Sequence, residues 1–276
     1  MAGTLYLVAT PIGNLEDITI RALNVLKSVD LIAAEDTRHT LGLLNHFEIS
    51  KPLISYYKQT EKAKSEVLIP KLLEGKNIAV VSDAGTPGIS DPGEEIVKQA
   101  IKNGIKIVPI PGACAFVNAL IASGMPTNEF EFIGFLSANK KERKDKLEDV
   151  KFDTRTLIFY EAPHKLRATL ETILEVLGDR KVVLARELTK IHEEYIRGNL
   201  STVLEQIVDI KGEFVIILEG NNISKKDLET NNLNEKTLEE HYAFYKAQGF
   251  DKKEIIKKIA KDRGVNKNEI YQYFLK

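Results

Sequence analysis

The sequence contains very little cysteine, since Cys114 is alone among 276 residues. A single thiol excludes an intrachain disulfide and cannot form a cysteine-based zinc site. The five histidines show neither an H-E-x-x-H pattern nor any other paired spacing of metal ligands. We therefore expect no metal centre, and we expect Cys114 to serve packing rather than nucleophilic catalysis.

Net charge and long apolar runs are lacking as well. No run approaches the ~18 residues that span a membrane, and the first residues show no charged segment followed by a long apolar core. The sequence therefore predicts a cytoplasmic protein with no membrane partner. With 39 basic and 40 acidic residues the net charge is −1, so any contact with nucleic acid must use local patches.

Two common nucleotide-binding motifs are absent. No G-x-G-x-x-G follows a predicted strand, and no G-x-x-x-x-G-K-[ST] occurs, because Gly75-Lys76 is followed by asparagine. These absences exclude an ordinary dinucleotide site and a P-loop.

The stretch with the strongest functional signal is SDAGTPGISDPG, residues 82–93, which directly follows the apolar run 78–81. Three glycines and two prolines within twelve residues predict a loop that exposes its backbone at the carboxyl end of a buried strand. Ligands bind at such strand ends in open α/β sheets. The alternative is a plain strand-to-helix connection, but these usually take roughly 2–6 residues. We therefore expect a binding loop.

Short apolar runs alternate with segments of helical spacing along most of the chain. This alternation predicts an α/β fold of two domains, residues 1–122 and 123–222, with a largely parallel first sheet. The expected strands are 5–9, 31–34, 53–57, 78–81, 105–110, 132–135, 157–160, 182–185 and 214–218. The expected helices are 17–29, 62–73, 94–103, 115–122, 140–150, 164–177 and 201–210.

The end of the chain differs in composition from the rest. Residues 221–234 are rich in asparagine and charge and indicate a linker, and residues 233–276 predict a helical extension resembling a helix-turn-helix. Between Lys246 and Lys276, nine basic residues stand against four acidic ones. The excess indicates either contact with nucleic acid or an ordinary helical appendage that completes the core or a dimer.

Six motifs occur in order over residues 8–194: VATPIGN, AEDTR, SDAGTPGISDPG, PIPGACA, FYEAPHK and ARELTKIHEE. Their combination resembles the 16S ribosomal RNA cytidine 2′-O-methyltransferases of the tetrapyrrole methylase superfamily, and the resemblance covers essentially the whole chain. It implies two α/β domains with S-adenosylmethionine in the cleft between them. It also implies an enzyme that methylates a decoding-centre ribose of 16S rRNA within the small ribosomal subunit. We expect a homodimer.

The resemblance assigns cofactor contacts to strand-end loops of both domains. The loop 10–14 is expected to form the floor of the cleft, the loop 82–93 to wrap the methionine end, and the second domain to close over the adenosine. Cys114 replaces the serine or threonine usual in the superfamily, so backbone groups are expected to serve there. The expected contacts are Pro11, Ile12, Gly13, Asp83, Gly85, Thr86, Pro87, Ser90, Ala113, Cys114, Ala115, Tyr160, Ala162, Ala185 and Glu219.

A ribose hydroxyl is a weak nucleophile at neutral pH, so a carboxylate or imidazole that accepts its proton assists the transfer. Four candidates directly follow expected strands: Asp36, Asp83, Glu161 and His164. Each is equally suited to cap a helix or to pair with a nearby arginine. We favour Asp36 as the base and Asp83 as a residue that orients the cofactor.

Basic residues are the candidates for RNA contact. Arg38 and Arg186 are expected to hold phosphate, and Lys252 and Lys253 belong to the basic tail. Two other functions fit parts of the sequence. A methyltransferase of a porphyrin-like small molecule does not explain the basic tail, and a non-catalytic RNA-binding assembly protein does not explain the full set of loops.

Overall fold

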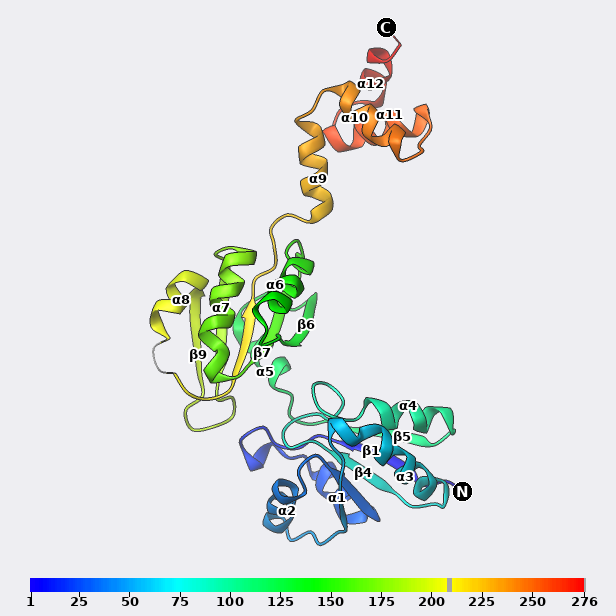
Figure 1. Cartoon of the computed structure of the whole chain (residues 1–276), viewed down its shortest axis with the longest axis vertical. Helices are drawn as coiled ribbons and strands as arrows, with labels where there is room; N and C mark the ends of the chain where they lie inside the picture. Colours follow the sequence, from blue (N-terminus) through cyan, green and yellow to red (C-terminus); the bar gives the residue numbers. More distant parts are fainter. Residues whose placement is uncertain (208–209, 276) are drawn as a thin grey trace.

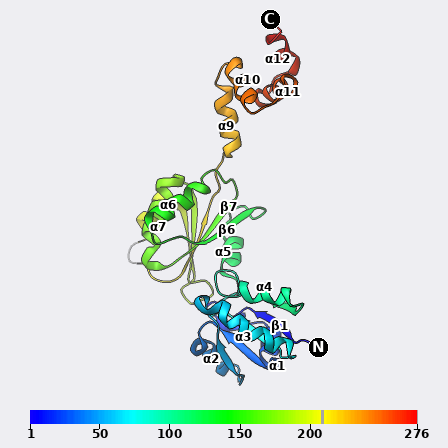
Figure 2. The same ribbon diagram turned by 45° about the vertical axis from the view of Figure 1, so that its right-hand side comes forward.

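The computed structural model describes residues 1–207 and 210–275. Two α/β domains and a helical unit follow one another along the long axis of the molecule (Figure 1). A view turned by 45° shows the same three parts, with the helical unit standing apart from both sheets (Figure 2). No helix of the described part has the length and apolar character needed to cross a bilayer.

The first domain contains a five-stranded sheet and the helices that cover it. Its strands are β1 (Thr4–Val8), β2 (Leu31–Ala34), β3 (Leu53–Ser55), β4 (Ile78–Val81) and β5 (Lys106–Ile110). Its helices are α1 (Ile20–Ser28), α2 (Thr37–His46), α3 (Glu61–Leu73) and α4 (Glu94–Lys102), with short 3-10 turns at Leu15–Asp17 and Lys58–Thr60. The strand order is β3-β2-β4-β1-β5, and every pair is parallel, as predicted.

Alternation of side chains along β4 explains why the apolar run 78–81 is continuous rather than amphipathic. Ile78 and Val80 pack in the core formed with α3 and α4, whereas Ala79 and Val81 pack in the core formed with α1 and α2. Helices therefore cover both faces of the parallel sheet, and all four residues are buried. The loop 82–93 leaves this central strand at its carboxyl end.

The second domain contains a mixed sheet in the order β6-β7-β10-β8-β9. Its strands are β6 (Phe130–Phe135), β7 (Thr156–Glu161), β8 (Lys181–Arg186), β9 (Glu194–Asn199) and β10 (Phe214–Leu218). Its helices are α5 (Ala115–Ser123), α6 (Lys140–Asp149), α7 (Pro163–Leu177) and α8 (Leu200–Gln206). Residues 208–209 of the predicted helix 201–210 lie outside the described part of the chain.

The two faces of this sheet are covered by different helices. Leu157 and Phe159 of β7 pack in the core formed with α6, α7 and α8, and Ile158 packs in the core formed with α5. Ala119 and Leu120 of α5 belong to that second core. The packing therefore assigns α5 to the second domain, and the predicted division between residues 122 and 123 is corrected to the segment 111–114, before this helix.

The helical unit comprises α9 (Lys225–Asn234), α10 (Leu238–Ala247), α11 (Lys252–Arg263) and α12 (Lys267–Tyr273). Ile255, Ile259 and Ile270 lie in a separate small core, together with aromatic side chains of α10. The predicted linker 221–234 is corrected, because α9 occupies most of it and the side-chain amide of Asn234 donates to Asp262 O at 2.7 Å.

Candidate functional site

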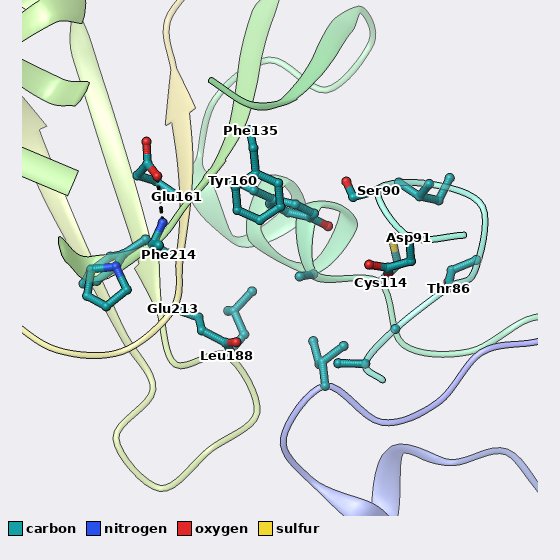
Figure 3. Close-up of a pocket in the computed structure, with 17 residues that line it drawn as sticks. Thr86, Ser90, Asp91, Cys114, Phe135, Tyr160, Glu161, Leu188, Glu213 and Phe214 are labelled. Atoms are coloured by element: carbon teal, nitrogen blue, oxygen red, sulfur yellow. Dashed lines mark hydrogen bonds between the residues drawn. The ribbon is translucent and has the colours of Figure 1, made fainter. Parts of the chain in front are cut away.

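A cavity of about 380 Å³ lies between the two sheets, within the range of small-molecule sites, roughly 300–1,000 Å³ (Figure 3). Loops at the carboxyl ends of β1, β4 and β5 form one wall, and the ends of β6, β7 and β8 with the start of β10 form the other. The lining residues are Ile12, Ala84, Gly85, Thr86, Ile89, Ser90, Asp91, Cys114, Ala115, Phe135, Tyr160, Glu161, Ala162, Pro163, Leu188, Glu213 and Phe214.

Hydrogen bonds join the three first-domain loops into one wall. The Thr10 N–H donates to Gly85 O at 2.9 Å, and the Gly85 N–H donates back to Thr10 O at 3.0 Å. The hydroxyl of Thr10 donates to Ser82 O at 3.1 Å, and that of Thr86 donates to Ala113 O at 3.1 Å. The wall is therefore fixed by its own backbone before any ligand binds.

Gly85 lies where the loop 82–93 contacts the other two loops. Its φ of +83° falls in the left-handed region, and a Cβ there would lie 3.3 Å from Cγ2 of Ile12 and 3.6 Å from Ala113 O. The other end of the loop is fixed by Glu61, whose Oε1 accepts from the Gly93 N–H at 2.7 Å and the Glu95 N–H at 3.0 Å. This carboxylate satisfies amides at the start of α4.

Tyr160 gives the opposite wall a hydroxyl donor. Its oxygen accepts from the Phe116 N–H at 3.2 Å, so its own proton is free to point into the cavity. Burial, with smaller contributions from Cys114 and Asp91, raises the pKa of Tyr160 to about 12, so the group stays protonated at neutral pH. Burial also raises the pKa of the Cys114 thiol, as expected for a packed rather than a reactive cysteine.

The loop between β8 and β9 closes the cavity below Tyr160, and sequence reasoning missed its role. Leu188 lines the cavity, while Glu187 and Thr189 beside it have positive φ angles of 51° and 68°. Lys190 Nζ lies 3.0 Å from Glu187 Oε1 and 3.1 Å from Glu213 Oε2. These ion pairs hold a backbone conformation that is costly for a threonine. The signal was present in ARELTKIHEE as a polar run between two strands.

Asp91 is the carboxylate that faces the cavity without a donor of its own. It points toward the Tyr160 hydroxyl and Cys114 (Figure 3), and no hydrogen bond reaches it from the described residues. Burial raises the pKa of Asp91, the charge of Asp83 adds to the increase, and Lys58 opposes it. Burial likewise raises the pKa of Glu35, with further contributions from Asp91 and Asp83. The negative charge of Asp83 thus disfavours the ionised forms of Asp91 and Glu35 at this edge.

The four predicted bases occupy different positions. Asp36 accepts from the Arg38 N–H at 2.8 Å and pairs with its side chain at 2.9 Å, which lowers the pKa of Asp36 to about 2. Asp83 Oδ1 accepts from the Asp36 N–H at 2.9 Å and so ties two loops together. Neither carboxylate lines the cavity. The structure thus leaves Asp36 outside the cavity and paired with Arg38, and a carboxylate paired with an arginine accepts a proton less readily.

Glu161 lines the cavity but both of its oxygens are occupied. Oε1 accepts from the Ala162 N–H at 2.8 Å and Oε2 from the Thr169 hydroxyl at 2.6 Å. The side chain therefore fixes the start of α7. His164 is exposed in the first turn of that helix and does not line the cavity.

The expected cofactor contacts divide into residues that line the cavity and residues that do not. Those lining it are Ile12, Gly85, Thr86, Ser90, Cys114, Ala115, Tyr160 and Ala162. Those behind the wall or in adjacent turns are Pro11, Gly13, Asp83, Pro87 and Ala113, and Ala185 is buried in the core under α5.

Glu219 is corrected outright, because β10 runs antiparallel to β7 and β8. Phe214 pairs with Glu161 in this register, so the start of β10 reaches the cavity. Glu219 follows the opposite end of the strand, near Lys181. The sequence did not reveal the direction of this strand, so Glu219 was assigned at the end away from the cavity.

The basic candidates lie on the outside of the molecule. Arg38 is exposed beside Asp36, whereas Arg186 is held by Glu194 at 2.8 Å and by Lys211 O at 2.6 Å. Lys252 and Lys253 are exposed at the start of α11, far from the cavity. In the described part of the chain no three His, Cys, Asp or Glu side chains are grouped so as to hold a metal ion.

The site and fold define a class of protein. Residues 4–204 match the family of Tetrapyrrole (Corrin/Porphyrin) Methylases, and the chain belongs to this family. Among curated relatives, Ribosomal RNA small subunit methyltransferase I of Halalkalibacterium halodurans is 52% identical over 99% of this chain and 94% of the relative. The protein of the same name from Bacillus subtilis is 50% identical over 99% of this chain and 94% of its own.

Solved structures share the fold at low identity. The methyltransferase CobJ has a TM-score of 0.59 and 17% identity over 79% of this chain and 95% of its own. Uroporphyrin-III C-methyl transferase from Thermus thermophilus, complexed with S-adenyl homocysteine, has a TM-score of 0.55 and 18% identity over 79% and 97%. A coverage of 79% corresponds to about the combined length of the two α/β domains.

Proposed function

We propose that this chain transfers a methyl group from S-adenosylmethionine to the ribose 2′-hydroxyl of a cytidine in 16S rRNA. The observation that carries the proposal is a cavity closed by strand-end loops of both domains, in a chain 52% identical to a small-subunit rRNA methyltransferase. The choice of a cytidine ribose rests on the resemblance of the six motifs to that group of enzymes.

The residues of the cavity suit the proposed cofactor. Gly85 leaves a space that a Cβ would fill beside Ile12, so a ligand can approach the loop backbone there. Asp91 and Glu213 offer negative charge to a sulfonium, and Leu188 and Pro163 offer an apolar surface to an adenine ring. The methionine end is assigned to the loop 82–93, and the adenosine to the second-domain wall.

The chemistry supplied by the bound cofactor is a methyl group on a positively charged sulfur. The protein must hold the acceptor hydroxyl in line with that group and accept its proton. We assign proton acceptance to Asp91, because it faces the cavity, has no competing donor among the described residues and is made more basic by burial. The Tyr160 hydroxyl is assigned a positioning role as a donor.

The test is methyl transfer to small ribosomal subunits from cells that lack this gene. Purified protein and labelled S-adenosylmethionine should place label on one cytidine, and mass mapping should locate it on the ribose. Label on a base, or no transfer to subunits, would overturn the proposal. Calorimetry with S-adenosylmethionine alone separates failure of cofactor binding from failure to accept the RNA.

The proposal extends to cytoplasmic action on the assembled small subunit by a homodimer. Support for self-association comes from α5, where Val117 and Ile121 lie one turn apart with 42% and 69% of their surface exposed. Light scattering should give the mass of two chains, and Ile121→Asp should give the mass of one. A monomeric wild type would remove the homodimer from the proposal.

A further inference from the structure

Phe135 is an aromatic side chain that the fold leaves exposed at the mouth of the cavity. It keeps 60% of its surface accessible and lines the cavity, and its ring centroid is 5.4 Å from that of Tyr160 in an edge-on arrangement. The neighbouring Phe132 is instead stacked on Phe116, with centroids 4.5 Å apart. Phe132 therefore belongs to the core, and Phe135 does not.

A β-bulge aims Phe135 at the cavity. The register of β6 on β7 shifts between Phe132 and Gly134, so that Phe135 pairs with Tyr160 rather than with Glu161. Without this shift in register, Phe135 would point to the other face of the sheet, because side chains alternate along a strand. Gly134 adopts a φ of +76°, which an L-residue would rarely accept. Bulges of this kind re-aim side chains beside active sites.

A second exposed apolar side chain faces the same opening from the first domain. Ile89 belongs to the loop 82–93, lines the cavity and is 49% exposed. The two domains approach each other here, since a Cβ on Gly134 would lie 3.9 Å from the Ser90 hydroxyl oxygen. Phe135 and Ile89 thus present an aromatic and an aliphatic side chain at one mouth.

We propose that Phe135 and Ile89 hold the base of the acceptor nucleotide, stacking a pyrimidine ring that has been turned out of the RNA. This inference rests on the proposed function. The base is joined to the ribose carbon next to the one that carries the 2′-hydroxyl. When this hydroxyl lies against the methyl group of the cofactor, the base therefore lies at the same opening. Unstacked RNA bases are commonly held on aromatic side chains, and stacking tolerates an open, wet rim.

The experiment compares Phe135→Ala with Phe130→Ala, a matched change in the same strand. Phe130 is 40% exposed but does not line the cavity. With small ribosomal subunits as substrate, Phe135→Ala should lower kcat/KM by about 5- to 150-fold, the range expected for one base–aromatic stack. Phe130→Ala should stay within twofold of wild type, and Phe135→Tyr should restore most of the activity.

Cofactor binding decides whether Phe135 stacks on the RNA base or on the adenine of the cofactor. The Kd of S-adenosylmethionine for Phe135→Ala should equal that of wild type, because the stacked ring belongs to the RNA. A parallel loss of cofactor affinity would mean that Phe135 stacks the adenine, and the inference would fail. Full activity of Phe135→Leu, which keeps the apolar volume without the ring, would also overturn it. Inactivity of the wild type on subunits would instead overturn the proposed function itself.

Discussion

Gly85 is a residue at which the central loop contacts both neighbouring loops. Gly85→Ala should weaken S-adenosylmethionine binding by about tenfold or more, because a Cβ at φ +83° costs roughly 1–2 kcal/mol and also presses on Ile12. Calorimetry measures the change. The matched control is Gly104→Ala, with φ +66° and open space around the Cβ. It should lower the melting temperature but leave the Kd unchanged; equal effects on Kd would remove the loop from the cofactor site.

Asp91→Asn tests the assignment of the proton acceptor. Asparagine keeps the shape but cannot accept the proton, so single-turnover methyl transfer at saturating S-adenosylmethionine should slow by roughly 10²–10⁴. Asp36→Asn should cost far less, because that carboxylate is already held by Arg38. If Asp36→Asn were the slower variant, the assignment would be reversed.

The pH dependence of the reaction follows from the raised pKa of Asp91. A base must be ionised to act, so kcat/KM should rise with pH through a value above the ordinary aspartate range. Folding stability should change with pH in the opposite direction to kcat/KM. A raised pKa of Asp91 means that the folded state binds the proton more tightly than the unfolded state does. The free energy of unfolding should therefore fall as pH rises through this window, and Asp91→Asn should flatten that slope in denaturant titrations.

Residue chemistry explains which site residues the sequence could reveal. The glycines and prolines of 82–93 identified the loop, because their effect on backbone conformation is local and can be read from the sequence. Asp91 lay inside that loop but was not singled out, since its exposure to the cavity and the charge of Asp83 depend on the fold. Phe135 was hidden for a similar reason, because a bulge between Phe132 and Gly134 changes its face without changing the apolar pattern.

Elements were predictable where apolar periodicity was strong. The strands β1, β4 and β5 are confirmed, but β9 was missed, because its charged residues suit an exposed edge rather than a core. The antiparallel direction of β10 could not be predicted, since an apolar run has no polarity in sequence. The helix α9 was missed because polar and charged residues dominate it and only Leu233 is buried.

The helical unit has a polar network that makes its stability sensitive to pH. His241 is fully buried, its Nδ1 accepts from Arg263 Nε at 3.3 Å, and its Nε2 lies 3.3 Å from Asp262 Oδ2. The neutral ring with a proton on Nε2 satisfies both partners, and burial lowers the pKa of His241. Because this pKa is lowered, the neutral ring of His241 stabilises the helical unit fully at pH values above the ordinary histidine pKa of about 6.5. This stabilisation is lost as pH falls through the lowered pKa.

Hydrogen exchange across α10 and α11 of the full chain measures this effect. Protection, corrected for intrinsic exchange rates, should be weaker at pH 5 than at pH 7.5. His241→Gln keeps a donor and an acceptor without titrating, so its protection should vary little with pH. His46→Gln, at the last turn of α2, should behave as wild type. Unchanged protection of the wild type across pH would show that His241 does not titrate in this range.

At the scale of the whole molecule, the second domain lies between the first domain and the helical unit in both views (Figures 1 and 2). The cavity is lined by residues of both α/β domains, so the second domain separates it from the helical unit. An RNA that reaches both the cavity and the helical unit must extend across the second domain. This suits a folded ribosomal subunit better than a short oligonucleotide. Lys253, Lys257 and Lys261 are exposed and lie four residues apart along α11, so they form one basic stripe. Lys258 instead lies 4.2 Å from the Phe250 ring and supports the unit itself.

The stripe allows a clean test of whether the helical unit contacts RNA. Changing Lys253, Lys257 and Lys261 to Glu should raise KM for small subunits and reduce the slope of log affinity against log salt by roughly three, about one per lost phosphate contact. The Kd of S-adenosylmethionine should not change. The control triple Lys27→Glu, Lys71→Glu and Lys102→Glu alters exposed lysines in the last turns of α1, α3 and α4, away from the cavity. Equal effects of the two triples would mean that the stripe acts only through the net charge of the protein. An unchanged salt slope would mean that the helical unit is a structural element that does not contact RNA.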